Sequence, residues 1–231
     1  GVLKGEFSFE AKNINLDFIY AWPNQTFDEL KKDIEFAVSL KPTHLSFYAL
    51  ILEPKTKLYH EYKNNHLDLI DEETDALMYE FIRDELPKHG FNQYEISNFA
   101  FQGFQSRHNL SYWQVDEYLG IGMGAHSQIN ERRFHNHSTL KKYIDAVKLS
   151  GNGIESEDPC DLLQETFLMG LRLNQGVNVN HFQEKFKINP FVKYPKLLKN
   201  IDEKLLVNED GIIKLTSKGQ LLLNYVEQSF I

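Results

Sequence analysis

The residue types best suited to chemistry lie close together between positions 94 and 127 of this sequence. The stretch contains a carboxylate in an apolar segment, a histidine among aromatic residues, and alternating glycines beside another histidine. These residues are Glu95; His108, Asn109, Tyr112 and Trp113; and Gly120, Gly122, Gly124 and His126. Polar groups and glycines set in so much apolar bulk are typical of a binding site built into a packed wall. We therefore expect a ligand site here.

Asp17 and Glu95 are carboxylates inside apolar, strand-like segments. In a closed or partly closed parallel barrel, inward side chains near the C-terminal ends of the strands face the site, where a carboxylate suits ribose hydroxyls or an amino group. Asp17 could equally sit at a strand edge and bond neighbouring backbone. Glu95 needs a partner if it is buried, and we favour a structural salt bridge for it.

His108 and Asn109 each stand four residues before an aromatic residue. In a helix this spacing stacks His108 on Tyr112 and Asn109 on Trp113. A histidine framed by aromatic rings can ligate a heme iron or contact another flat ligand. It can also cap a helix or hydrogen-bond in the core, and the residues by themselves favour that structural interpretation.

Residues 120–125 formally match the dinucleotide fingerprint G-x-G-x-x-A, which requires a strand before it and a helix after it. We expect residues 114–119 to be helical, and residues 128–133 lack a buried helical face, so we reject a dinucleotide site. Alternating glycines instead allow a backbone or a flat ligand to approach closely. His135 and His137 alternate on an apparent strand, but without a third ligand nearby we favour solvated surface histidines.

The composition is typical of a globular protein in a reducing cytoplasm. A net charge of -8 argues against broad binding to nucleic acid or anionic membranes, and no apolar run has membrane-spanning length. The single cysteine, Cys160, excludes a disulfide framework, and this chain alone offers no thiolate set for a four-iron cluster or a Cys-rich zinc site.

The N-terminal half reads as an α/β fold. Residues 14–20 form a short apolar run that predicts a buried strand, and Thr26 with Glu29 forms a capping box that opens a helix ending before Pro42. Residues 44–50 predict a second strand. A strand, a helix and a strand over so few residues make a βαβ unit, which requires a parallel sheet. A long helix then ends at Gly90, and residues 91–96 predict a third strand.

We place a domain boundary at the linker candidate of residues 151–153, which gives domains 1–152 and 153–231. Helices are expected over residues 138–149, over 159–173, after an Asn180 cap, over 191–205 and after Thr216. Residues 208–211 predict a hairpin turn before the last of these helices. Helices followed by a hairpin and a helix indicate a winged-helix-like module. From Asp158 onward the sequence has nine acidic and nine basic residues. This module therefore lacks the net positive charge of a DNA-binding domain.

Four motifs carry a resemblance to a known family. Residues 15–26, NLDFIYAWPNQT, are similar to the I-D-L-I-Y-G-L-P-x-Q-T signature of oxygen-independent coproporphyrinogen III oxidases and their relatives, which are radical S-adenosylmethionine (SAM) proteins. Residues 94–100, 108–113 and 120–127 resemble the branch that acts as heme chaperones (HemW type). The H-N-x-x-Y-W motif separates that branch from the true oxidases.

The resemblance implies a partial (β/α)6 radical SAM barrel followed by a helical C-terminal domain. The family holds its [4Fe-4S] cluster on a C-x-x-x-C-x-x-C motif that this sequence lacks, so the chain resembles only the C-terminal part of a member. By position, Asp17 matches an S-adenosylmethionine contact, and Ile51 and His126 fall at further contacts. His108, Asn109, Tyr112 and Trp113 form the motif with a heme-related role.

The resemblance favours a truncated heme chaperone, whose parent binds heme and passes it to heme-accepting proteins. The alternatives are the C-terminal part of a coproporphyrinogen oxidase in porphyrin biosynthesis and a stand-alone binding or scaffold domain. We expect the chain alone to bind no cluster and to be inactive in radical chemistry. We also expect it to expose the strand starting near Ile14, because the family's earlier strands are absent. Homodimerisation, strand swapping or limited solubility should follow from that unpaired edge.

Overall fold

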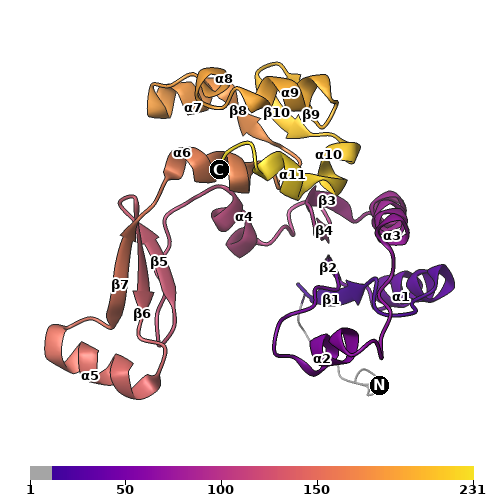
Figure 1. Cartoon of the computed structure of the whole chain (residues 1–231), viewed down its shortest axis with the longest axis horizontal. Coiled ribbons are helices and arrows are strands. Elements are labelled where there is room, and N and C mark those ends of the chain that lie inside the picture. The colour runs from indigo at the N-terminus through magenta and orange to yellow at the C-terminus, as the bar shows by residue number, and fades with distance from the viewer. Residues whose placement is uncertain (1–11) are drawn as a thin grey trace. The chain divides into compact units, whose positions relative to one another are not determined.

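The computed structural model describes residues 12–231, which form two compact units that meet in sequence between Ser106 and Arg107 (Figure 1). The first unit contains one sheet and its covering helices. Its elements are β1 (Asn15–Tyr20), α1 (Phe27–Ser39), β2 (His44–Ala49), α2 (Lys57–Lys63), α3 (Glu72–Glu85), the 3₁₀ helix η1 (Leu86–His89), β3 (Asn92–Glu95) and β4 (Asn98–Ala100).

The predicted βαβ unit is confirmed. β1 and β2 pair in parallel with Asn15 opposite His44, and α1 connects them. Thr26 caps α1 as the sequence predicts, because its side chain accepts a hydrogen bond from the Glu29 backbone while the Glu29 carboxylate accepts one from the Thr26 backbone. Local sequence signals are therefore sufficient to set this part of the fold.

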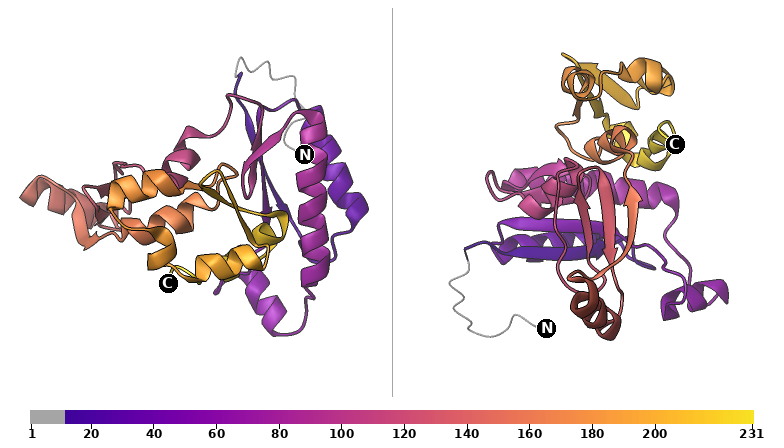
Figure 2. Two further views of the ribbon diagram at one scale, coloured as in Figure 1. Left: turned by 90° about the horizontal axis from the view of Figure 1, so that it is seen from above. Right: turned by 90° about the vertical axis from the view of Figure 1, so that its left-hand side faces the viewer.

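The complete sheet is mixed, in the order β1-β2-β4-β3. The predicted strand at residues 91–96 exists as β3, but the short strand β4 lies between it and β2 and pairs antiparallel with both. α1 and α3 lie side by side on one side of the sheet (Figure 2, left). They cover an apolar face whose fully buried residues include Leu30, Ile34, Leu45, Phe47, Met78, Ile82 and Phe99.

β1 differs from the buried strand that its apolar run predicts. Among the described residues it pairs only with β2, and its side chains alternate between exposed and partly buried until Tyr20. Ile19 is exposed on the face opposite the helices. The helices cover one face of the sheet, so alternate side chains of β1 point away from the core.

The second unit contains two three-stranded antiparallel sheets with helices. Its first elements are α4 (Arg107–Trp113), β5 (His126–Ile129), β6 (Arg132–Asn136), α5 (Leu140–Ser150) and β7 (Ile154–Pro159), of which the strands form the sheet β5-β6-β7. The remaining elements are α6 (Leu162–Gly170), β8 (Val177–Asn178), α7 (Val179–Phe186), α8 (Pro190–Lys193), α9 (Lys196–Asp202), β9 (Leu206–Glu209), β10 (Ile212–Leu215), α10 (Ser217–Leu221) and α11 (Leu223–Glu227). Here the sheet order is β8-β10-β9.

Several local predictions in this unit need correction. Residues 114–119 are not helical, because Tyr118 pairs with Gln128 beside β5. The cap of α7 is Asn178, whose side chain accepts a hydrogen bond from the His181 backbone, and not Asn180. The expected helix over residues 191–205 is two short helices, separated at Tyr194 and Pro195. Proline restricts the residue before it away from helical geometry, which ends α8 there.

The segment at residues 151–153 is a turn inside the second unit. Gly151 ends α5 in a left-handed conformation with a φ of 78°, and the chain then enters β7, which pairs with β6. The predicted hairpin is confirmed: Asp210 and Gly211, with φ of 51° and 80°, join β9 to β10. Both residues are in the left-handed region that a type I′ turn requires.

The C-terminal end of α7 gives a prediction about stability. Lys187 is exposed and caps the helix with a φ of 57°, which strains any residue with a Cβ atom. We expect Lys187→Gly to raise the free energy of unfolding by about 1 kcal/mol. The matched control is Glu184→Gly on the exposed face inside α7, which should lower it by about 1 kcal/mol. Urea denaturation of both variants tests the pair, and a destabilised Lys187→Gly would contradict the prediction.

Candidate functional site

The first unit presents a polar sheet face opposite its helices. Side chains alternate along a strand, and residues paired across strands share a face. Asn15 and Asp17 therefore lie on the same face as their partners His44 and Ser46, and Asn98 pairs with Ser46 on the next strand. The sheet thus has one face packed in the core and one face of hydrogen-bonding groups.

His44 is the centre of a hydrogen-bond network on this polar face. Its Nδ1 lies 2.6 Å from Asn15 Oδ1, and its Nε2 lies 2.8 Å from the Tyr94 hydroxyl. Asn15 Nδ2 in turn donates to Asp17 Oδ1 at 3.0 Å. The Tyr94 hydroxyl also accepts from the Ser106 backbone at 3.3 Å. This network holds Asp17 through Asn15 and leaves Asp17 exposed.

Glu95 is almost completely buried, with 1% of its surface exposed. Its Oε1 accepts a hydrogen bond from the Ser97 backbone at 3.1 Å and another from the Asn98 side chain. Burial of a carboxylate requires such donors. These two amide donors hold the Glu95 carboxylate in the turn between β3 and β4.

The three residues predicted to contact S-adenosylmethionine are divided between the two units. Asp17 lies in the middle of β1, opposite Ser46, whereas Ile51 lies beyond the C-terminal end of β2 and is 75% exposed. His126 belongs to the second unit. Asp17 and Ile51 both belong to the first unit. The sequence analysis did not single out His44 and Asn15. The only sequence feature that indicates them is the alternation of polar and apolar residues along their strands.

His44 gives a prediction about pH. Burial lowers the pKa of His44 below its ordinary value, and the Asp17 carboxylate acts in the opposite direction. The folded state therefore binds fewer protons than the unfolded chain, so the free energy of unfolding should fall as the pH drops from about 7.5 to about 5.5. The contribution of His44 is present above the unfolded pKa and is lost as the pH falls through and below it.

The measurement is a urea denaturation series at both pH values for the wild type and His44→Gln. Taking the difference between the two proteins removes the contribution of the other titrating groups. We expect the variant to lose less stability than the wild type on acidification. An equal or larger loss in His44→Gln would contradict a buried, neutral histidine at this position.

In the second unit, α4 carries the H-N-x-x-Y-W motif as two pairs on different sides of the helix. His108 and Tyr112 are both exposed, and their rings meet edge to face with centroids 4.8 Å apart. This confirms the stacking that their spacing predicts. The Tyr112 ring continues to the Tyr118 ring at 4.7 Å. His108 and Tyr112 therefore face solvent, and the partly buried Tyr118 continues this row of three aromatic side chains.

Asn109 and Trp113, which form the second pair, are both partly buried. The Arg172 guanidinium lies 4.7 Å from the Trp113 ring centroid, a cation–π distance, and Arg172 Nη1 is 3.6 Å from Glu227 Oε1. Trp113 Nε1 is buried without a hydrogen-bond partner among the described residues. Trp113 therefore anchors α4 to the helices that follow. Its contact residue Arg172 was not singled out by the sequence analysis.

The row of rings connects α4 to the sheet β5-β6-β7. Tyr118 pairs with Gln128, whose side-chain oxygen accepts from Arg133 Nη2 at 2.7 Å. Arg133 also contacts Glu165 Oε2 at 3.0 Å. The side chains paired across these strands share one sheet face. His126, two residues before Gln128 on β5, lies on this same face.

The glycine-rich stretch forms a loop against β5. The Gly120 backbone donates to Ser127 Oγ at 2.9 Å, and a Cβ atom at Gly120 would overlap the His126 carbonyl oxygen. The predicted close approach of another backbone is thus confirmed at Gly120. His126 is exposed and lies opposite His135, with ring centroids 4.5 Å apart. Within residues 12–231, no group of three or more His, Cys, Asp or Glu residues is placed to hold a metal ion.

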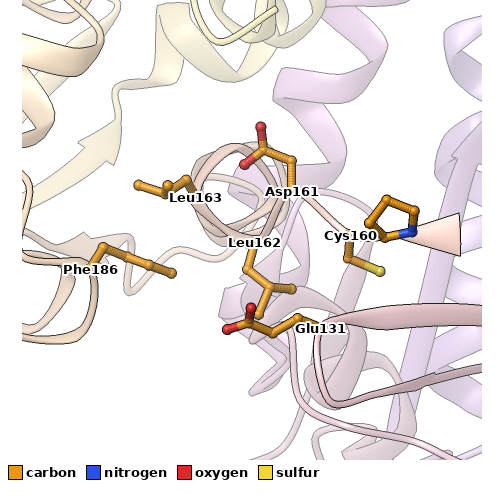
Figure 3. Close-up of a pocket in the computed structure, with 7 residues that line it drawn as sticks. Glu131, Cys160, Asp161, Leu162, Leu163 and Phe186 are labelled. Atoms are coloured by element: carbon orange, nitrogen blue, oxygen red, sulfur yellow. The ribbon is translucent and has the colours of Figure 1, made fainter.

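A pocket of about 410 Å³ lies where β7 meets α6 (Figure 3). Leu162 and Glu131 point toward one another there, while the Asp161 carboxylate points away. Cys160 also lines it, and burial raises the pKa of the thiol while Arg133 acts in the opposite direction. A raised pKa disfavours the reactive thiolate. None of the predicted site residues lines this pocket, so we do not include it in the candidate site.

Comparisons with known proteins point to one kind of protein. Residues 158–222 match the family HemN C-terminal domain. The chain is 38% identical to heme chaperone HemW of Bacillus subtilis over 98% of its own length and 60% of that protein. It is 37% identical to heme chaperone HemW of Lactococcus lactis, over 95% of its own length and 59% of that protein. The chain therefore spans somewhat less than two thirds of these relatives.

Among solved structures, the fold is similar to coproporphyrinogen III oxidase (HemN) of Escherichia coli, a radical SAM enzyme. The TM-score is 0.71 at 18% sequence identity, covering 94% of this chain and 54% of that one. At this identity the likeness concerns the mixed α/β fold. No helix of residues 12–231 has the length and apolar character needed to cross a membrane. Together these comparisons confirm the resemblance that the motifs predict, to the radical SAM relatives of coproporphyrinogen III oxidase and, among them, to the HemW heme chaperones.

Proposed function

We propose that this chain is the heme-handling part of a HemW-type heme chaperone. The complete protein would bind heme and deliver it to acceptor proteins. The observation that carries the proposal is the division of the H-N-x-x-Y-W helix into two sides. Trp113 attaches α4 to the rest of the unit through Arg172 and Asn109 is partly buried, whereas His108 and Tyr112 are exposed and paired. A ligand-binding helix needs this combination of a fixed side and a free side.

His108 supplies the chemistry of the proposed heme site. An imidazole nitrogen is a common axial ligand of heme iron, and neighbouring aromatic rings provide apolar surface for the macrocycle. Tyr112 holds the His108 ring edge to face and continues into Tyr118. The row of rings, exposed at His108 and Tyr112, fits a flat cargo that must enter and leave.

In the complete protein, we propose that Asp17 contacts S-adenosylmethionine on the polar sheet face, beside a [4Fe-4S] cluster held by residues outside this chain. The parallel β1-α1-β2 unit fits the C-terminal part of a (β/α)6 barrel. For residues 153–231 we propose a winged-helix-like domain, which the hairpin β9-β10 among short helices supports. A single cysteine in 231 residues suits a reducing cytoplasm.

A heme titration of the purified chain tests the proposal. We expect His108→Ala to weaken binding of ferric heme by about tenfold or more and to change the Soret band, because Ala supplies no iron bond. Tyr112→Phe should have a smaller effect, since it removes one hydroxyl and keeps the stacked ring, a change worth about 1 kcal/mol or less. Absorbance titration gives the affinity and the spectrum together.

His181→Ala is the matched control, because His181 is an exposed histidine on α7 in the same unit. It should leave both the affinity and the Soret band unchanged. A thermal melt of each variant separates ligation from structure. If folded His108→Ala keeps the wild-type affinity and spectrum but melts at lower temperature, His108 has a structural role and the proposed ligand is wrong.

A further inference from the structure

A pair of histidines on the sheet β5-β6-β7 offers a second place where heme iron could be held. His126 on β5 and His135 on β6 are cross-strand partners. Their rings lie 4.5 Å apart between centroids with an angle of 33° between the ring planes. His126 is exposed, whereas His135 is partly buried. The His126 ring is therefore supported on one side by a neighbour and is open to solvent.

The partly buried histidine has a carboxylate nearby. Glu155 on β7 lies near two imidazoles, with its Oε2 at 3.9 Å from His135 Nδ1 and its Oε1 at 3.3 Å from His137 Nδ1. The separation from His135 is too long for a hydrogen bond, so Glu155 acts on His135 as a neighbouring charge. His135 therefore has the Glu155 carboxylate and the tilted His126 ring as neighbours.

Exposed apolar side chains lie in the loop that precedes His126 in the chain. Leu119, Ile121 and Met123 alternate with the glycines of the loop before β5 and are 70%, 84% and 53% exposed. Gly120 holds this loop against the His126 backbone. Three large apolar side chains so exposed on one short loop mark a binding surface. A tetrapyrrole combines an apolar macrocycle with an iron that needs a nitrogen ligand, which is the combination offered here.

The histidine pair is also connected to the α4 motif within the second unit. Tyr118 meets Tyr112 of α4 and pairs with the buried Gln128, and His126 lies on the Gln128 face of β5. The second unit therefore has two exposed imidazoles, His108 and His126, on elements that Tyr118 joins.

We propose that His126 is a heme-iron ligand and that His135 positions its ring. The inference rests on the proposed function, since it names a second contact for the same cargo. His126 supplies an imidazole nitrogen to the iron, and the exposed side chains of residues 119–123 contact the macrocycle. No covalent bond within heme is changed, so binding and release need no further reactant.

The experiment is a titration of the chain with hemin, in parallel with iron-free protoporphyrin IX. We expect His126→Ala to lower hemin affinity by about tenfold or more and to shift the Soret band toward a weaker-ligand spectrum. Binding of the iron-free porphyrin should change little, because it makes no iron bond. Free imidazole should restore the hemin spectrum of His126→Ala.

His135 is tested by two substitutions. His135→Ala removes the ring that supports His126 and should lower hemin affinity, whereas His135→Phe keeps a flat ring without a nitrogen and should recover most of the loss. His181→Ala again serves as the control without effect. If His135→Phe behaves like His135→Ala while the fold is intact, the positioning role is wrong.

The outcomes separate this inference from the proposed function. If His108→Ala loses hemin and folded His126→Ala keeps the wild-type affinity and spectrum, the inference is overturned and the proposed function stands. If His126→Ala loses hemin and iron-free porphyrin equally, His126 contacts the macrocycle and ligation is overturned. If His108→Ala binds hemin as tightly as the wild type while His126→Ala binds it more weakly, the proposed ligand His108 is wrong and this inference stands.

Discussion

Replacing Phe167 by Ala should lower the free energy of unfolding of the second unit by about 3 to 5 kcal/mol. Phe167 is fully buried on α6, and its ring meets those of Phe182, Tyr194 and Phe230 with centroids 5.0, 5.7 and 5.0 Å apart. Truncation leaves a cavity among three other aromatic rings, and neighbouring rings so closely packed can fill it only in part. The core that supports β8-β10-β9 and the short helices depends on this contact.

The two tryptophans of the chain make the measurement specific. In a Trp22→Phe background, Trp113 is the remaining tryptophan, and its fluorescence reports on residues 107–231. Phe36→Ala is the matched control, because Phe36 lies on α1 and is 54% exposed. Urea denaturation should show a lower midpoint for Phe167→Ala alone. A loss below about 1 kcal/mol for Phe167→Ala would contradict a central role for this ring.

Glu95→Ala should destabilise the first unit by about 3 kcal/mol. The substitution leaves the Ser97 backbone amide and the Asn98 side chain without the acceptor that both use in a buried turn. Leaving buried donors unsatisfied costs more than the hydrogen bonds themselves contribute. The turn joins β3 to β4, so its loss also affects the strand that lies between β2 and β3.

Two variants control for this effect. Glu95→Gln keeps a side-chain oxygen at the same position and should cost clearly less than Glu95→Ala. Glu35→Ala removes an exposed carboxylate from α1 and should change stability by about 0.5 kcal/mol or less. Unfolding followed by Trp22 fluorescence in a Trp113→Phe background measures the first unit. Equal costs for the Ala and Gln variants would show that the acceptor oxygen is unimportant.

The motif on α4 illustrates how a structure changes the meaning of a sequence signal. Four residues with one expected role divide into an exposed pair, His108 and Tyr112, and a partly buried pair, Asn109 and Trp113. Substitutions in the two pairs should therefore have different consequences. Changes to the exposed pair should act on heme binding, and changes to Trp113 should act on stability through Arg172.

Interactions within one turn or one helix could be predicted from the sequence alone. The capping box of α1, the stacking of His108 on Tyr112 and the turn at Asp210 and Gly211 each involve residues at most four positions apart. Their geometry follows from backbone preferences and side-chain reach, which the residue types determine. The parallel pairing of β1 and β2 was also predictable, because the intervening helix requires it.

Contacts between distant residues were decided by the tertiary structure. β4 inserts between β2 and β3, Trp113 packs on Arg172, and His126 pairs with His135, although no local pattern selects these partners. Residues 114–119 have a helix-like pattern, yet Tyr118 pairs with Gln128 beside β5. Tertiary packing overrides weak local propensity in short segments, and the partner that wins depends on the whole sheet. The connection between the aromatic row and the histidine pair through Tyr118 arises in this way.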